Sequence, residues 1–147
     1  MNTIQKERGK QVLRIFLSYT TADRTYAHKL YSLLSQRPNL RIFTTEMFSA
    51  GEDWESKLKD RLSQCDIFMV LLSSNSVDSK WVLHELGAAW ALDKPIIPIV
   101  TYPELISKIP LTLGGIRFVE IKDLEKPEVI SKILEHYEEV ATSHIRG

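Results

Sequence analysis

Apolar residues along this chain switch between short continuous runs and helical spacing. Between the first two runs, Ala27, Leu30 and Leu34 recur at i, i+3 and i+7. That spacing predicts a helix over Thr20–Gln36, capped by one of its first two threonines. Alternation of this kind is typical of a parallel sheet covered by helices on both faces. The continuous runs predict five strands, at Leu13–Leu17, Leu40–Phe43, Asp66–Leu72, Ile96–Val100 and Ile116–Ile121.

Three later segments have the apolar spacing of amphipathic helices, and the proline-bounded piece Tyr102–Pro110 stays ambiguous. Alternating strands and helices predict a flavodoxin-like α/β fold, with a doubly wound five-stranded parallel sheet in the order 2-1-3-4-5. We expect a polar extension over residues 1–11, one domain over 12–142 and a tail over 143–147. The helical stripes are Trp54, Leu58 and Leu62; Val82, Leu86 and Ala89, from Ser79 to about Leu92; and Ile130, Ile133, Leu134 and Tyr137, after Lys126.

In this strand order, ligands bind beyond the carboxyl ends of strands one and three, at the loops Ser18–Asp23 and Ser73–Ser79. Neither loop carries a glycine-rich phosphate-binding motif, so a standard dinucleotide or P-loop site is not expected. A phospho-receiver domain would need an acceptor aspartate after strand three, where Ser73 stands, and acidic metal ligands after strand one. The sequence therefore excludes the commonest occupants of this crevice.

Composition and charge limit the classes of partner that this chain is expected to bind. The 147 residues carry 19 basic and 19 acidic side chains, so no net field favours nucleic acid or an acidic membrane. No apolar run approaches the ~20 residues of a membrane span, and residues 1–11 lack the apolar centre of a secretory signal. The single cysteine, Cys65, fits a reducing compartment, so we expect a cytoplasmic protein. The four histidines are scattered, and we expect no metal site.

Trp81 and Glu85 stand out at the start of the helix that follows strand three. Their spacing of four places them on one helical face, which we read as offset from the Val82–Leu86–Ala89 stripe. A large aromatic beside a carboxylate can hold a flat cationic ring. The alternative is that Glu85 only complements the helix dipole and Trp81 is partial core. Spacing alone leaves both interpretations open.

Three segments follow one another along the chain: Arg14–Tyr19, Phe43–Trp54 and Ser79–Trp90. Together they resemble the boxes of TIR (Toll/interleukin-1 receptor/resistance) domains, and the last of them looks most like bacterial examples. Arg14–Tyr19 with Asp23 is similar to the first box, and Phe43–Trp54 is similar to the BB loop. Ser79–Trp90, followed by Lys94–Ile99, is similar to the αC box and fourth strand. The W-x-x-x-E pair, Trp81 and Glu85, resembles the pair shared by the branch of the family that cleaves NAD⁺.

The resemblance implies cleavage of the nicotinamide–ribose bond, with NAD⁺ as substrate rather than cofactor. Glu85 then stands at the catalytic position and Trp81 packs on a ring of the nucleotide. Thr45 stands where many family members have an aspartate. It can still bind substrate by a hydrogen bond to a ribose hydroxyl but contributes no charge, which puts substrate affinity in doubt. The other implied site residues are Tyr19 and Thr20, on the opposite wall; Ser18 and Asp23, which order their loop; and Met47, Phe48 and Gly51, in a BB loop that serves assembly. For Phe48, plain loop packing is an equal alternative.

The leading hypothesis is therefore a TIR-domain NAD⁺ nucleosidase, a glycohydrolase or cyclase, activated by self-assembly in immune or anti-phage defence. Its expected partners are NAD⁺, other TIR domains and a fused or separate sensor. The first alternative is a non-catalytic adaptor that recruits other TIR domains. The second alternative is a module that binds a nucleotide signal without changing it. We expect an exposed Glu85, so that changing it to alanine leaves the fold intact.

Overall fold

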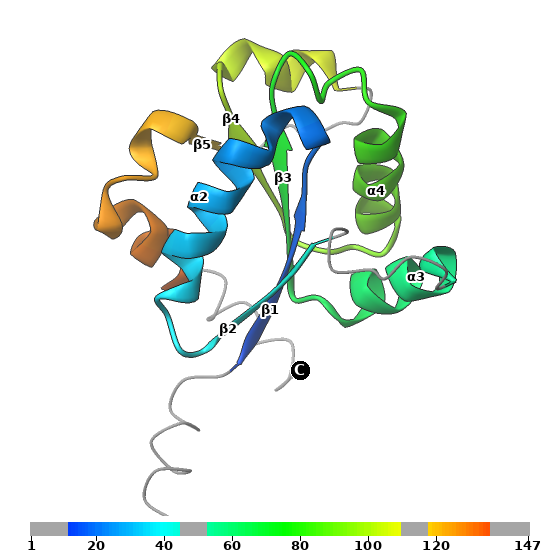
Figure 1. Cartoon of the computed structure of the whole chain (residues 1–147), viewed down its shortest axis with the longest axis horizontal. Coiled ribbons are helices and arrows are strands. Elements are labelled where there is room, and N and C mark those ends of the chain that lie inside the picture. Colours follow the sequence, from blue (N-terminus) through cyan, green and yellow to red (C-terminus); the bar gives the residue numbers. More distant parts are fainter. Residues whose placement is uncertain (1–11, 45–52, 110–117, 136–147) are drawn as a thin grey trace, which may run out of the picture.

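A computed structural model describes residues 12–44, 53–109 and 118–135 of the chain. Its centre is a five-stranded sheet in the order β2-β1-β3-β4-β5, seen between two layers of helices in Figure 1. Every neighbouring pair is parallel, and the predicted fold class and strand order are confirmed. The strands are β1 (Leu13–Ser18), β2 (Leu40–Thr44), β3 (Ile67–Leu72), β4 (Ile96–Val100) and β5 (Val119–Glu120).

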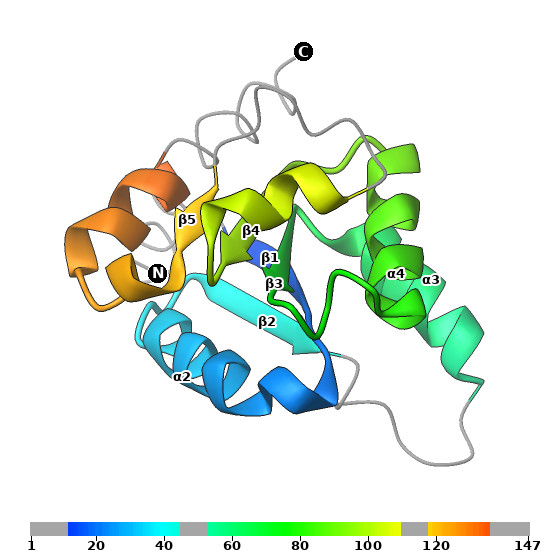
Figure 2. The same cartoon turned by 90° about the horizontal axis from the view of Figure 1, so that it is seen from above.

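Helices cover both faces of this sheet. Figure 2 shows α2 on one side, and α3 and α4 on the other. The helix that opens at residue 127 is described to residue 135 and joins the α2 side. The bounds of the remaining elements are α2 (Arg24–Ser35), α3 (Trp54–Gln64), α4 (Lys80–Ala91), and the 3₁₀ turns η1 (Thr21–Asp23), η3 (Pro103–Lys108) and η4 (Ile121–Asp123).

Strand β1 shows how the sheet divides the core into two. Successive side chains of a strand point to opposite faces. Accordingly, Ile15 and Leu17 belong to the apolar cluster beneath α2, while Phe16 belongs to the cluster beneath α3 and α4. Phe16 stacks on Phe68 of β3, with ring centroids 5.8 Å apart. All six residues of β3 are buried, as its continuous apolar run predicts for a central strand.

Two predicted boundaries are corrected. The first helix does not begin as an α-helix at Thr20: the chain passes through η1 and becomes α-helical at Arg24. Thr20 makes no side-chain cap, because its hydroxyl donates to the Asp23 carboxylate at 3.0 Å. Strand five is shorter than predicted where it is described, because Ile121 already begins η4. Residues 116 and 117 of the prediction lie outside the described residues.

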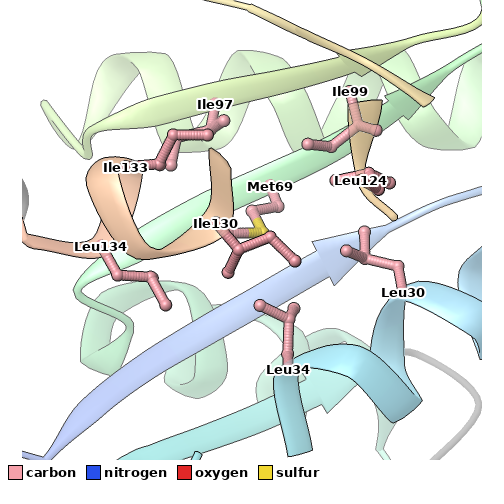
Figure 3. A pocket seen from close by; sticks show the side chains of 9 residues that line it. All are labelled: Leu30, Leu34, Met69, Ile97, Ile99, Leu124, Ile130, Ile133 and Leu134. Atoms are coloured by element: carbon pink, nitrogen blue, oxygen red, sulfur yellow. The ribbon is translucent and has the colours of Figure 1, made fainter. Parts of the chain in front are cut away.

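A small apolar cavity lies between α2, the sheet and the C-terminal helix (Figure 3). Its volume of about 10 Å³ is at the lower limit for one water molecule. The cavity lies in the α2 core, on the face of the sheet away from α4. It is a packing gap and does not mark the functional site. Its lining is wholly apolar, from Leu30, Leu34, Met69, Ile97, Ile99, Leu124, Ile130, Ile133 and Leu134.

Candidate active site

Ser18 and Glu85 meet where β1 ends. Ser18 is the last residue of β1 and points, like Phe16, to the α4 side of the sheet. Its hydroxyl donates a 2.8 Å hydrogen bond to Oε1 of Glu85, and both side chains have no exposed surface. The carboxyl therefore lies at the switch point of the sheet, where an α/β fold places its ligands.

Helix α4 delivers Glu85 to this position. The Ser79 side chain caps the helix by accepting from the Val82 amide at 3.3 Å. The buried residues of α4 are Val82, Glu85, Leu86 and Ala89, which recur at i, i+3, i+4 and i+7. Glu85 thus belongs to the apolar stripe that packs on the sheet. The predicted offset from that stripe, and the exposed carboxylate that followed from it, were wrong.

Burial controls the charge of Glu85. Oε2 of this carboxyl is buried and has no hydrogen-bond partner, and Oε1 has the Ser18 hydroxyl. Burial raises the pKa of Glu85 from 4.5 to about 8, and the Ser18 hydrogen bond acts in the opposite direction. At neutral pH the enclosed carboxyl is therefore mostly protonated. A ligand that brings positive charge to Oε2 would favour the ionised form.

Trp81 lies one turn before Glu85 and is partly buried against the cluster beneath α4. Its ring stacks on His84, with centroids 6.5 Å apart and an angle of 27° between the planes. His84 is exposed on the outer side of the helix. Trp81 therefore lies at the boundary between core and surface, packed as partial core with the residue only partly buried.

Asp23 joins the loops that follow β1 and β3. This carboxylate is 2% exposed and ends η1, just beyond β1. It accepts from the Ser73 hydroxyl at 2.6 Å and from the Asn75 side-chain amide at 3.4 Å, both in the loop after β3. It also accepts from Thr20 at 3.0 Å. Three donors from two loops thus converge on one carboxylate, in line with the ordering role that the resemblance implies for Asp23.

The loop after β3 supplies residues that the sequence did not single out individually. The Ser73 hydroxyl accepts from the backbone amides of Asn75 and Ser76 while donating to Asp23. The Ser76 hydroxyl in turn accepts from the Ser73 amide at 2.7 Å. The signal available in the sequence was the polar run Ser73–Ser76 directly after a fully apolar strand. Its role depends on a partner far away in the chain, so the run alone could not identify it.

The remaining predicted site residues do not gather in one place. Tyr19 is 6% exposed and belongs to the core beneath α2, on the other face of the sheet from Glu85. Thr20 is partly exposed and bonds to Asp23. The candidates Thr45, Met47, Phe48 and Gly51 lie outside the described residues. The structure therefore brings together Ser18 with Glu85, and Thr20 with Asp23.

Neither a metal-binding cluster nor a membrane-spanning helix occurs among the described residues. In those residues, no three His, Cys, Asp or Glu side chains are grouped so that they could hold a metal ion. His28 and His84, the two histidines described, are both exposed. Over the same residues, no helix combines the length and the apolar character needed to cross a bilayer.

Similar folds occur in proteins of distant sequence. The crystal structure of the TIR domain of the Toll-related receptor TRR-2 from Hydra magnipapillata is 17% identical, with a TM-score of 0.66. The similarity covers 85% of this chain and 97% of that one. The Clostridium botulinum CMP N-glycosidase BcmB is 20% identical, with a TM-score of 0.57 over 79% of this chain and 98% of its own. A comparison with curated proteins finds no match.

Fold and site together define a doubly wound α/β domain with a buried carboxyl at its switch point. The sequence pattern of the TIR domain matches residues 15–134, from β1 into the C-terminal helix. The chain belongs to the TIR-domain family. The resemblance noted in the sequence is confirmed at this level, and the described residues of all three boxes lie on β1, β2, α4 and β4 or the segments that flank them.

Proposed function

We propose that this TIR domain cleaves the N-glycosidic bond between nicotinamide and ribose in NAD⁺, with Glu85 as the catalytic residue. The observation that carries the proposal is Oε2 of Glu85, a buried carboxyl oxygen without a hydrogen-bond partner at the switch point of the sheet. An uncompensated buried carboxyl is costly for a fold and is typical of functional sites. The fold alone does not identify the reaction.

The chemistry suits a single carboxylate. Cleavage of a glycosidic bond passes through an oxocarbenium-like state, in which positive charge develops on the sugar. Nicotinamide leaves with the electron pair of the bond and becomes neutral, so it needs no proton from a general acid. Ionised Glu85 would stabilise the developing cation through Oε2. Water, or a hydroxyl of the same molecule, then adds to the anomeric carbon and loses its proton.

The positive nicotinamide ring also helps to ionise Glu85. In the enclosed state, burial holds the pKa of this carboxyl near 8. A cationic ring beside Oε2 favours the carboxylate and lowers that pKa. Trp81, which is partly buried one turn earlier, would pack on a ring of the nucleotide. Since Glu85 has no exposed surface, substrate reaches Oε2 only after side chains around the carboxyl have moved.

A nicotinamide-release assay tests the proposal. Purified protein, over concentrations that take it from monomer to assembly, is incubated with NAD⁺ and the products are separated by chromatography. Wild type is expected to release nicotinamide, and Glu85→Gln to lose turnover by about 100-fold or more. Glutamine keeps the shape of the side chain and an oxygen for Ser18 but carries no charge. It is preferred to alanine, which would leave a cavity beside Ser18.

A matched control uses a second glutamate. Glu128 lies exposed in the C-terminal helix, and Glu128→Gln makes the same chemical change away from the crevice. It is expected to turn over NAD⁺ at the wild-type rate. Absence of nicotinamide release from wild type at every concentration would contradict the proposed activity and favour the hypothesis of a non-catalytic adaptor. Equal turnover by wild type and Glu85→Gln would remove Glu85 from the mechanism.

A further inference from the structure

We propose that Ser18 is the positioning residue of this site: its hydroxyl occupies Oε1 of Glu85 and so makes Oε2 the oxygen that meets substrate. The inference rests on the proposed function and adds a second residue with a separate role. Ser18 acts through Glu85: it orients the carboxyl group and favours its ionised form. The carboxyl has two otherwise equivalent oxygens, and the serine removes that equivalence.

The geometry fixes the serine more firmly than the glutamate. Ser18 is in β1, paired with Val70 of β3, and its side chain is completely buried. Glu85 reaches the same point from α4, at the end of a longer and more flexible side chain. The 2.8 Å bond between them joins residues 67 positions apart. A donor held by a central strand can therefore hold the carboxyl in one rotamer.

Charged neighbours do not compete with Ser18 for this role. Helix α4 packs on β1 and β3, and those strands carry one ionisable side chain, Arg14, which is exposed. On α4 itself, Lys80 and His84 are exposed. Asp23, the other buried carboxylate at this edge, bonds to Ser73, Thr20 and Asn75.

The other described elements that share the α4 core are α3, η3, β4 and the end of β2. Strand β4 carries no charged side chain, and Arg41 of β2 is exposed. The charged side chains of α3 and η3 are exposed except Arg61, which is partly buried and lies 4.3 Å from the centre of the Phe43 ring. The described surroundings of Glu85 thus provide one hydroxyl and no opposite charge. Ser18 is the group that favours the ionised carboxyl against the effect of burial.

The sign of the serine's effect follows from the hydrogen bond. A donor to Oε1 stabilises the carboxylate, so the bond lowers the pKa of Glu85 while burial raises it. Removing the hydroxyl leaves burial unopposed, and the pKa of Glu85 then rises above its wild-type value of about 8. Less carboxylate is present at neutral pH, and the reaction needs a higher pH to reach the same rate.

Ser18→Ala tests this inference through two titrations. In ¹³C NMR spectra, the Glu85 side-chain carboxyl is assigned by its absence from Glu85→Gln, and its midpoint is expected to move to higher pH in Ser18→Ala. The acid limb of kcat/KM for nicotinamide release should move in the same direction, since kcat/KM reports ionisations of the free enzyme. Activity near neutral pH falls and is recovered at high pH. A purely structural role would lower the rate at every pH alike.

Ser73→Ala is the matched control, because Ser73 is a buried serine at the same edge whose hydroxyl bonds to Asp23 instead. It is expected to leave the Glu85 midpoint unchanged. Ser18→Thr keeps a hydroxyl and should restore a midpoint close to wild type. An unchanged Glu85 midpoint in folded Ser18→Ala, or an equal shift in Ser73→Ala, would overturn the inference.

A measurement on the native serine decides the case in which Ser18→Ala fails to fold. The ¹³Cβ shift of Ser18 should titrate with the same midpoint as the Glu85 carboxyl in wild type and become independent of pH in Glu85→Gln. A Ser18 shift that ignores Glu85 would contradict the inference. The two proposals also fail separately. A Glu85 midpoint that depends on Ser18 in a protein without turnover overturns the function alone, whereas turnover with an unshifted pH profile overturns the role of Ser18.

Discussion

Ser73 donates a 2.6 Å hydrogen bond to Asp23, and this bond connects the loops that leave β1 and β3. Both side chains are buried, at 4% and 2% exposure. In a doubly wound sheet, ligands bind between two such loops, beyond the carboxyl ends of the strands at the switch point. Asp23 ties the two loops together, because its carboxylate also accepts hydrogen bonds from Thr20 and Asn75.

Replacing Asp23 by alanine is expected to lower the free energy of unfolding by about 1 to 3 kcal/mol. The substitution leaves the buried Ser73 hydroxyl without its acceptor and removes the bonds that tie Thr20 and Asn75 to the same carboxylate. Urea denaturation monitored by circular dichroism measures the change. The control is Asp78→Ala, in the same region but exposed, which should change stability by less than about 0.5 kcal/mol. Equal effects of the two substitutions would contradict the role given to Asp23.

Glu85 should make stability depend on pH in an unusual direction. Its pKa is about 8 in the folded chain against an ordinary 4.5, so the folded state binds the proton more tightly. Its contribution is fully present below about pH 4.5 and is lost as the pH rises to about 8, with a slope of at most about 1.4 kcal/mol per pH unit. Above about pH 8 the contribution no longer changes.

Urea unfolding at a series of pH values measures this slope, and Glu85→Gln serves as the reference. Other titrating groups contribute to both proteins, so the difference between the two curves isolates Glu85. Glutamine places an amide where Oε2 was unpartnered, so the slope is compared rather than the absolute stability. Parallel curves between pH 5 and 8 would show that the folded carboxyl titrates like a solvated one.

The strand order was predictable because alternating strands and helices favour a doubly wound sheet of this order, and the continuous apolar runs located its strands. The run around Phe68 is apolar at every position, which marks a strand covered on both faces, and all of β3 is buried. Helix α4 was located by Val82, Leu86 and Ala89, and the same stripe contained a further signal. Glu85 stands at i+3 of a pattern whose other members are core, so its position alone indicated a carboxyl facing the sheet.

Burial of Glu85 could not be deduced from residue type, since glutamate is almost never fully buried without a partner. Its partner Ser18 belongs to a different element, and only the folded sheet brings the two within 2.8 Å. The bond between Asp23 and Ser73 was equally hard to predict, because the two residues are 50 positions apart in the sequence. Local patterns predicted the elements, whereas contacts between loops required the three-dimensional arrangement.

Gly87 offers a stabilising substitution within α4. A Cβ added at this glycine would meet no atom within 4 Å, and the residue lies in the helix interior. Alanine restricts the unfolded chain and favours the helix, so Gly87→Ala should raise the free energy of unfolding by about 0.5 to 1 kcal/mol. Thermal and urea unfolding both measure it. A loss of stability would mean that the space beside Gly87 is filled in solution.

Cys65 should be inert in the folded protein. The side chain is 2% exposed, and burial raises the pKa of its thiol to about 11. Only about one thiol in 1,000 is then ionised at pH 8, and the thiolate is the reactive form. We expect very slow labelling by a thiol reagent in buffer and complete labelling in denaturant. Rapid labelling under native conditions would show that the end of α3 opens easily.

The cap of α4 links stability to the proposed reaction, because the helix that it begins carries Glu85. Ser79 accepts from the Val82 amide, and Ser79→Ala leaves that amide without its partner. The free energy of unfolding should fall by about 1 kcal/mol. Fraying of the first turn also loosens Trp81, so we expect a higher KM for NAD⁺ with a smaller change in kcat. Ser79→Asp restores an acceptor at the cap and should recover both properties. Failure of the aspartate to recover KM would indicate that Ser79 acts on substrate otherwise than through the helix.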